Sequence, residues 1–266
     1  MSKTGTAFRQ AYRDYRLHLR SLVAASALLS APTIVILLIR RLLARYMNLP
    51  LSRSGSAALL LIETAASLIS AGALALLAAD LRAGGTWGWR DSWSRVLGRA
   101  RPIITGGLAG LLVTALTGGP IALFLICFIL GGEPGTGPAS LFPSLLALGV
   151  FCCFMFCASS LILLLTVVTA VEQTGGFRAT RVTWQLLRKD LRRSVFTIGL
   201  AQSLIFVPNL ALRLGHVRHP IAAALEGAGA VIVAPFVVLV VMSVYWEARD
   251  ADGAGATRLR ANLDAQ

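Results

Sequence analysis

Only a few polar side chains fall inside the apolar stretches of this sequence, and they are the first candidates for chemistry. Glu63 and Glu226 each lie near one end of an apolar run, and Asn209 and Arg213 end a third run. A lone charge in hydrocarbon costs about 2.5–3.5 kcal/mol on insertion scales, so such groups should face one another or water. We predict an intramembrane polar cluster around an outward-facing cavity, with Glu226 paired to Arg213. The alternative is that both acids are protonated or shallow enough to reach the headgroups.

Sequence motifs for catalysis, metals or cofactors are missing. The chain has no Walker A loop, no Gly-x-Gly-x-x-Gly opening a helix, and no His-Glu-x-x-His or Gly-x-Ser-x-Gly motif. His216 and His219 lack a third ligand, so they are interpreted as loop histidines. Thiols in hydrocarbon stay protonated, so the cysteines are interpreted as small packing residues: Cys127, Cys152, Cys153 and Cys157. No catalytic residue, metal or cofactor is predicted.

Regularly spaced arginines form the second candidate site. In residues 1–20 they make one stripe of a helix, beside an apolar face of Phe8, Tyr12, Tyr15, Leu19 and Leu22. Such a helix is expected to lie in a membrane interface, with rings among the headgroups and guanidinium groups on phosphates. A solvated helix without lipid preference is the alternative. The predicted contacts to anionic lipid are Arg9, Arg13, Arg16, Arg20, Arg90, Arg95, Arg181 and Arg188.

A longer basic and aromatic pattern occurs twice. Gly84–Trp93 and Gly175–Trp184 both read Gly-Gly, four residues, Arg, two residues, Trp, and basic residues and an apolar run follow. In the first copy, Trp93 falls on one helix face, with Arg95 and Arg99 on the other. Each Gly pair is interpreted as the end of one helix before the next begins. Phosphate binding at the following helix N-terminus is the alternative.

Long apolar runs are the elements that must position these side chains. The mean hydropathy is +0.73, and charged residues make up 14% of the chain. Six apolar runs of 18 residues or more predict membrane-spanning helices, since hydrocarbon requires each backbone polar group to be satisfied within its own segment. We predict an all-α, polytopic membrane protein with one domain (residues 1–250) and a disordered cytoplasmic tail (251–266). The predicted spans are Leu22–Ile39, Ala57–Ala79, Ile103–Leu130, Ser144–Val171, Ser194–Leu212 and Ile221–Tyr245.

Glycine and proline mark two features of the third predicted span. Gly118-Gly119-Pro120, near its middle, predicts either a kink or a re-entrant break, because the proline cannot donate a helical hydrogen bond. Gly106 and Gly110 form a small-xxx-small pair, which predicts close packing against another helix.

The six spans group into three tandem hairpin repeats, at about residues 7–80, 84–172 and 175–247. Each repeat has an amphipathic interfacial helix before its first span, which we call the pre-span helix, and an acid after its second: Asp80, Glu172 or Glu247. With the N-terminus inside, 19 of the 25 Lys and Arg residues lie on the inner side. This excess places both termini in the cytoplasm. The net charge of +13 thus lies beside lipid headgroups, which argues against nucleic acid as a partner.

Short motifs at the span ends are the most distinctive parts of the sequence: Tyr12, Trp93 and Trp184 before spans, and Ala79–Arg82, Glu172 and Tyr245–Arg249 after them. Through these motifs, residues 8–250 resemble the bacterial six-span family named after the membrane domain of certain glycerophosphoryl diester phosphodiesterases. The resemblance implies a multi-pass protein of the bacterial inner membrane. The family's namesakes carry catalysis on a separate soluble barrel with a His-Arg motif and metal-binding carboxylates. Nothing here matches that barrel, so phosphodiesterase activity is not expected.

The predicted function is that of a non-enzymatic accessory or scaffold protein that acts through its basic pre-span helices. The expected partners are anionic membrane lipids, or another membrane protein or an ATPase. The alternative is a small transporter or an ABC-type permease subunit, favoured by the repeats, the interrupted third span and the intramembrane acids. An intramembrane enzyme needs converging acid, base or nucleophilic groups, and the sequence offers no such set.

Overall fold

The computed structural model describes residues 3–29, 31, 35, 53–83, 89–131, 138–214 and 219–250. Within these ranges some side chains, among them those of residues 53–60, 63, 119–131, 138–148 and 209–214, are not described. The described residues are helical apart from short turns and contain no strand. An apolar helical segment, Leu19–Leu29, follows the first helix. The helices are α1 (Lys3–Leu17), α3 (Arg53–Arg82), α4 (Trp89–Gly98), α5 (Ala100–Gly131), α6 (Pro138–Glu172), α7 (Gly176–Lys189), α8 (Leu191–Leu214) and α9 (His219–Asp250).

Several of these helices are long and apolar enough to cross a membrane. Among the described residues, three segments have this length and apolar composition: Thr64–Arg82 in α3, Ala100–Gly118 in α5 and Val231–Asp250 in α9. A fourth candidate joins Phe156–Glu172 to Gly176–Lys189 through a bend of 112°. The second to sixth predicted spans each lie within one helix, and the first is described only at residues 22–29, 31 and 35. The protein is therefore helical, with three to four membrane-compatible helices in the described part.

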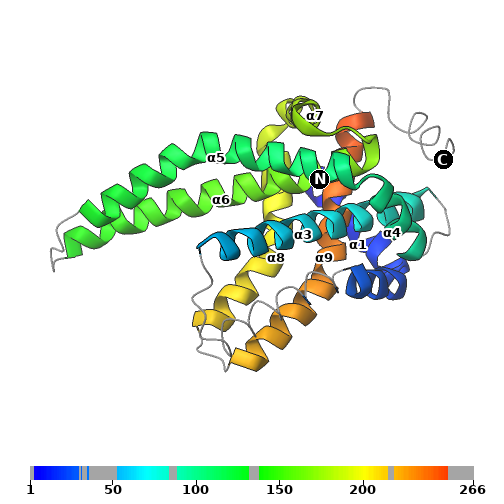
Figure 1. Ribbon diagram of the computed structural model, residues 1–266, viewed down its shortest axis with the longest axis horizontal. Helices are drawn as coiled ribbons and strands as arrows, with labels where there is room; N and C mark the ends of the chain where they lie inside the picture. Colours follow the sequence, from blue (N-terminus) through cyan, green and yellow to red (C-terminus); the bar gives the residue numbers. More distant parts are fainter. Residues whose placement is uncertain are drawn as a thin grey trace.

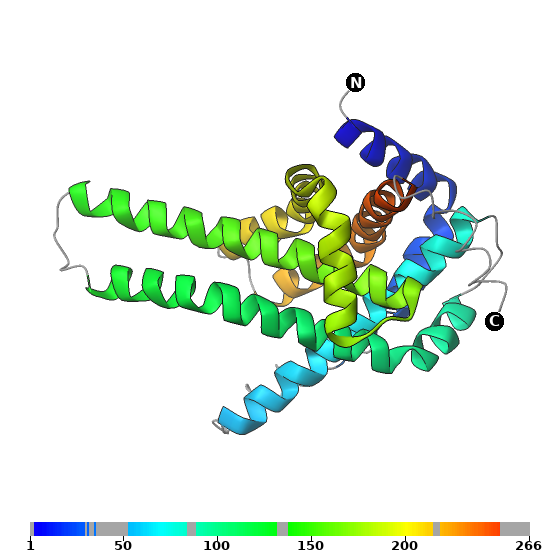
Figure 2. The same ribbon diagram turned by 90° about the horizontal axis from the view of Figure 1, so that it is seen from above.

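The helices converge at one end and separate at the other. α5 and α6 form a long hairpin that extends beyond the rest of the molecule in both views (Figures 1 and 2). α8 and α9 form a second pair, and α3 packs against α5, α6 and α9. The last turns of α3, α6 and α9 meet the first turns of α5 and α8, together with α1, α4 and α7 (Figure 1). We call this meeting point the closed end.

The hydrophobic core lies at the closed end. Nearly every residue of 73–79 in α3, 164–171 in α6 and 237–246 in α9 is buried. These helix ends are apolar on all sides, and a helix of that kind is surrounded by other helices. Gly72 allows α3 to approach this centre, because a Cβ there would lie 2.9 Å from Cδ1 of Ile103. The core thus holds together the helix ends that carry the polar residues described below.

The glycines of α5 allow close contact with α6. A Cβ added at Gly106 would overlap Thr169, and one added at Gly110 would overlap Leu165. The close packing predicted from this small-residue pair is confirmed.

α5 is also one continuous helix through Gly118-Gly119-Pro120, so the predicted re-entrant break is wrong. Neighbouring helical hydrogen bonds and contact with α6 keep the segment helical despite the missing donor.

The buried face of α1 differs from the face predicted from its apolar spacing. Tyr12 is 58% exposed and Leu19 is 42% exposed, whereas Ala7 and Ala11 are fully buried. α1 packs against α9, and small side chains let the two helices approach closely. The predicted face is therefore wrong for Tyr12 and Leu19, where alanines pack instead, whereas Phe8, Tyr15 and Leu22 do pack against the core.

The other two rings of α1 join α9. Phe8 and Tyr15 pack against Phe236, with ring centroids 6.1 and 5.8 Å apart. The Tyr15 hydroxyl donates a hydrogen bond to the Ile232 carbonyl at 2.8 Å, and burial raises the pKa of Tyr15. These two rings stabilise the helix pair, and their place among lipid headgroups stays a prediction.

Candidate functional site

The acid that ends α6 ties that helix to α9. The Tyr245 hydroxyl donates a hydrogen bond to Oε1 of Glu172 at 2.9 Å, and Nε of Arg249 donates to the same oxygen at 2.9 Å. The Nη2 group of Arg249 also forms an ion pair with this carboxylate. Charge-assisted hydrogen bonds are about twice as strong as neutral ones, and these side chains are largely buried. The C-terminal ends of α6 and α9 are thereby held together.

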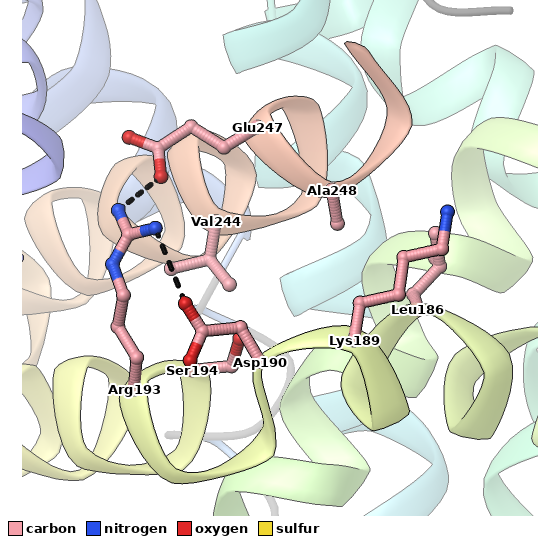
Figure 3. A pocket seen from close by; sticks show the side chains of 8 residues that line it. All are labelled: Leu186, Lys189, Asp190, Arg193, Ser194, Val244, Glu247 and Ala248. Atoms are coloured by element: carbon pink, nitrogen blue, oxygen red, sulfur yellow. Dashed lines mark hydrogen bonds and ion pairs between the residues drawn. The ribbon is translucent and has the colours of Figure 1, made fainter. Parts of the chain in front are cut away.

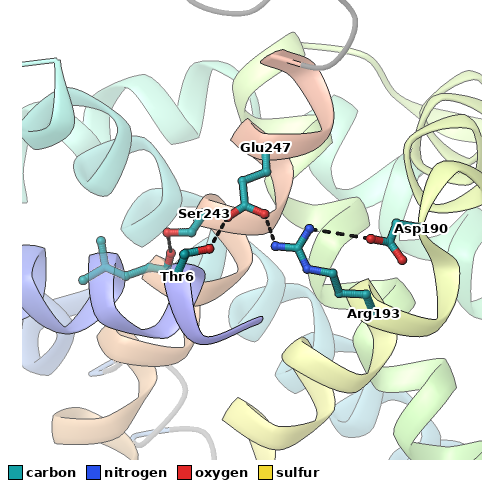
Figure 4. Close-up of polar contacts among 6 residues, drawn as sticks. Thr6, Asp190, Arg193, Ser243 and Glu247 are labelled. Carbon is teal, nitrogen blue, oxygen red and sulfur yellow. Dashed lines mark hydrogen bonds and ion pairs between the residues drawn. The ribbon is translucent and has the colours of Figure 1, made fainter. Parts of the chain in front are cut away.

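The acid near the end of α9 makes a second set of contacts (Figure 4). Arg193 of α8 pairs with Oε2 of Glu247, and its Nη1 lies 3.6 Å from Oδ2 of Asp190. Thr6 of α1 donates a hydrogen bond to Oε1 of Glu247 at 3.5 Å. Glu247 therefore joins α1, α8 and α9 at the closed end.

Arg99, in the turn between α4 and α5, is buried. It is 6% exposed, and its Nη1 donates a hydrogen bond to the Ala170 carbonyl at 2.6 Å. The last carbonyls of a helix lack helical partners and attract positive charge, so Arg99 stabilises the C-terminus of α6. Burial, and secondarily the neighbouring charge of Arg95, lowers the pKa of Arg99. The helix face opposite Trp93, where Arg99 was predicted, is thus partly buried at this point, because the buried end of α6 needs a donor.

A pocket of about 210 Å³ opens beside the contacts of Glu247 (Figure 3). It lies where α7 meets α8 and is closed on one side by the last turns of α9. Basic, acidic and apolar side chains share its wall: Leu186, Lys189, Asp190, Arg193, Ser194, Val244, Glu247 and Ala248. The pocket thus combines charges of both signs in one small space.

The second Gly-Gly pair makes the turn into α7. Gly175 is the N-cap of that helix, and a Cβ there would lie 2.9 Å from Cα of Pro102. Gly176 has φ +60°, a conformation that favours glycine. The interpretation of this pair as a boundary between two helices is confirmed. The first pair, Gly84-Gly85, lies outside the described residues.

α7 presents an aromatic and basic face outward. It turns by 112° from the direction of Phe156–Glu172, so it runs across that helix instead of continuing it. Its inner face, which packs on the bundle, consists of Ala179, Thr183, Leu186 and Leu187. The residues exposed along the other side are Phe177 (64% exposed), Trp184 (52%), Arg178, Arg181 and Arg188. Rings and guanidinium groups therefore share one accessible surface, which we call the α7 face.

The structure places the predicted lipid contacts as follows. Seven of the eight arginines are exposed, on α1, α4, α7 and the segment after α1. Arg95 is half-buried, and its Nη1 atom is buried. Exposure makes contact with headgroups possible at the seven, and lipid binding itself stays a prediction.

The predicted intramembrane cluster lies outside the described side chains. The backbone of Glu63 lies in α3, that of Asn209 and Arg213 in α8, and that of Glu226 in α9. Their side chains are not described, so the pairing of Glu226 with Arg213 stays a prediction.

Two of the cysteines are described: Cys153 and Cys157 are exposed on α6, so their interpretation as packing residues is wrong. In apolar runs, an outward thiol meets lipid as readily as it meets another helix.

The residues missed by sequence reasoning are the partners at the closed end: Arg99, Glu172, Arg193, Tyr245, Glu247 and Arg249. One signal for them was available. An acid follows the second span of each predicted repeat, and this regularity marks a buried polar contact as well as a repeat boundary. The spacing carries no information about the partners, because Glu172 and Arg249 are 77 residues apart.

No protein-family model, curated protein or solved structure matches this chain. Its function is therefore inferred from the geometry of the closed end and the α7 face.

Proposed function

We propose that this chain is a non-enzymatic membrane scaffold that holds anionic lipid headgroups along its cytoplasmic surface. In this proposal six spans form three hairpin repeats in a bacterial inner membrane, with both termini in the cytoplasm. The pre-span helices lie at the headgroup level on that side, and the closed end holds them in place. The ion pairs of Glu172 and Glu247 then have a structural role, since they fix the helices that carry the basic surface.

The observation that carries the proposal is the α7 face. α7 turns by 112° from Phe156–Glu172, so with α6 as a span, as proposed, α7 lies near the membrane plane. Exposed aromatic rings with neighbouring arginines are typical of the membrane interface, where rings sit among headgroups and guanidinium groups bind phosphates. Phe177, Trp184, Arg181 and Arg188 meet both conditions on one side of one helix. Exposed apolar side chains that share one side of a helix, rimmed by polar groups, mark a surface for interaction with a membrane or a partner.

The test measures lipid retention by the full-length chain. The protein is reconstituted into nanodiscs of phosphatidylcholine and phosphatidylglycerol, extracted into neutral detergent, and the bound lipids are counted by native mass spectrometry. Each arginine near an anionic surface contributes about 1 kcal/mol, so a double variant Arg181→Gln, Arg188→Gln should retain phosphatidylglycerol about thirtyfold less tightly. Added salt should reduce the retention by the unaltered chain.

The matched control removes two charges elsewhere. Arg258→Gln, Arg260→Gln lies in the C-terminal segment and loses the same net charge. It should retain phosphatidylglycerol as the unaltered chain does. Equal losses in both double variants would mean that net charge alone attracts lipid, and the α7 face would then have no special role.

A further inference from the structure

The pocket between α7, α8 and α9 is separate from the α7 face, but the two lie next to each other. Lys189 is the last residue of α7, and Ser194 lies in the first turn of α8. If the α7 face lies among headgroups, as proposed above, the pocket opens at the same depth. A ligand from the headgroup layer can therefore reach it without crossing the hydrocarbon core. The inference below rests on that proposed function for its source of ligand.

The pocket carries balanced charge. Two basic residues, Lys189 and Arg193, and two acidic residues, Asp190 and Glu247, line it. In Figure 3, Lys189 lies on one side of the pocket, and Arg193 with its two carboxylates lies on the other. A simple anion would be repelled by the two carboxylates, and a simple cation would be repelled by Lys189. A ligand with one group of each sign, held a few ångströms apart, matches both sides.

The acidic side keeps acceptor capacity after its ion pairs are made. Arg193 uses Oε2 of Glu247 and Oδ2 of Asp190. A carboxylate offers about four lone-pair positions, so both can accept further hydrogen bonds. The Asp190 side chain is 51% exposed, which leaves it accessible to a ligand. Ser194, 7% exposed, also lines the pocket on this side, and its hydroxyl oxygen can accept a hydrogen bond.

The volume limits the size of the ligand. A protein cavity of about 150 Å³ holds benzene, with six non-hydrogen atoms, so a pocket of about 210 Å³ takes about eight. Phosphoethanolamine has eight such atoms, with an anionic phosphate at one end and an ammonium group at the other. Phosphocholine has eleven, and its methylated nitrogen has no hydrogen to donate. Leu186, Val244 and Ala248 provide an apolar wall for the two carbons between the charges.

We propose that this pocket binds a phosphoethanolamine unit. Lys189 holds the phosphate, and the ammonium donates hydrogen bonds to Asp190, Glu247 and the hydroxyl oxygen of Ser194. The unit can be the headgroup of phosphatidylethanolamine or a free small molecule, since both present the same two charges. The pocket thereby selects a zwitterion beside a surface that attracts anions.

The experiment compares lipids on the full-length chain in neutral detergent. Phosphatidylethanolamine, phosphatidylcholine and phosphatidylglycerol with identical acyl chains are titrated, and native mass spectrometry gives each dissociation constant. The unaltered chain should bind phosphatidylethanolamine about tenfold more tightly than phosphatidylcholine, because the latter loses charge-assisted hydrogen bonds. Lys189→Gln and Asp190→Asn should each remove most of this preference. Arg192→Gln is the matched control, because Arg192 is exposed, adjacent and not part of the pocket wall, and it should keep the preference.

A second arm separates the two sources. Soluble phosphoethanolamine is titrated by calorimetry against the same four proteins. If Lys189→Gln and Asp190→Asn weaken binding of soluble phosphoethanolamine but not of the lipid, the ligand of the pocket is a free molecule. If they also weaken binding of phosphatidylethanolamine, the ligand is the lipid headgroup. Equal binding of all three lipids with no response to phosphoethanolamine would overturn the proposal, as would equal losses in Lys189→Gln and Arg192→Gln. The Arg181, Arg188 double variant tests the scaffold function separately, because it changes phosphatidylglycerol retention and leaves the pocket intact.

Discussion

The two copies of the Gly-Gly pattern fold into helices with the same register and different surfaces. Trp93 of α4 corresponds to Trp184 of α7, and the small polar residue before each, Ser92 or Thr183, is buried. The apolar residue three positions after each Trp is also buried: Val96 in α4 and Leu187 in α7. The backbone of both copies therefore meets the bundle through the same positions.

The copies differ where the arginines lie. In the first copy Arg95 is half-buried and Arg99 is buried, whereas the corresponding positions of the second copy hold buried Leu186 and exposed Asp190. The arginines of α7 are all exposed. One copy thus uses basic residues to stabilise the bundle, and the other presents them outward. Two copies of one sequence pattern can therefore play different roles. Arginines become buried where a neighbouring helix end lacks hydrogen-bond donors, and they stay exposed where no such helix end lies beside them.

The largest effect should come from the buried arginine of the first copy. Arg99→Met removes the donor to the Ala170 carbonyl, and a lost hydrogen bond to a charged group costs about 1.5–3 kcal/mol. The melting temperature of the chain in detergent should fall by roughly 5–10 °C. Arg101→Met is the control, because Arg101 is exposed two residues away, and it should melt within about 2 °C of the unaltered chain. Equal melting of both variants would show that Arg99 does not stabilise α6.

Replacing the corresponding tryptophans of the two copies should lower the unfolding free energy by different amounts. Trp93 is half-buried against the core, so Trp93→Ala should cost about 1–2 kcal/mol of unfolding free energy. Trp184 is 52% exposed, so Trp184→Ala should cost less than about 0.5 kcal/mol. Thermal unfolding followed by the remaining tryptophan fluorescence measures both. A larger loss for Trp184→Ala would reverse the assignment of the two helices.

The smallest change in stability is expected from alanine at two glycines, one that begins α7 and one that ends α4. Gly176 has φ +60°, and an L side chain in that conformation costs about 1 kcal/mol, so Gly176→Ala should lower the stability by that amount. A Cβ on Gly98 meets no atom within 4 Å, so Gly98→Ala should leave the stability unchanged or raise it slightly. Chemical denaturation of the purified variants compares the two, and equal stabilities would argue against a strained turn before α7.

Much of the helical architecture follows from local sequence patterns. Apolar runs longer than 18 residues locate α3, α5, α6, α8 and α9, because a long apolar stretch satisfies its own backbone as a helix. The glycine pair of α5 correctly indicated close packing, since glycine leaves room for a neighbour wherever that neighbour lies. Periodicity also located the pre-span helices. It failed to select the buried face of α1 correctly, because the partner of α1 accepts Ala7 and Ala11 in preference to Tyr12.

By itself, the sequence determined where helices form, where charge is concentrated and where glycine permits a turn, since these depend on residues within a few positions of one another. Only the tertiary structure decided which charges are paired and which remain accessible. Arg193 meets Glu247 across 54 residues, and Arg99 meets the Ala170 carbonyl across 71. Contacts of this kind are set by which helix ends meet in the core, and a buried helix end requires donors or acceptors that an exposed one obtains from water.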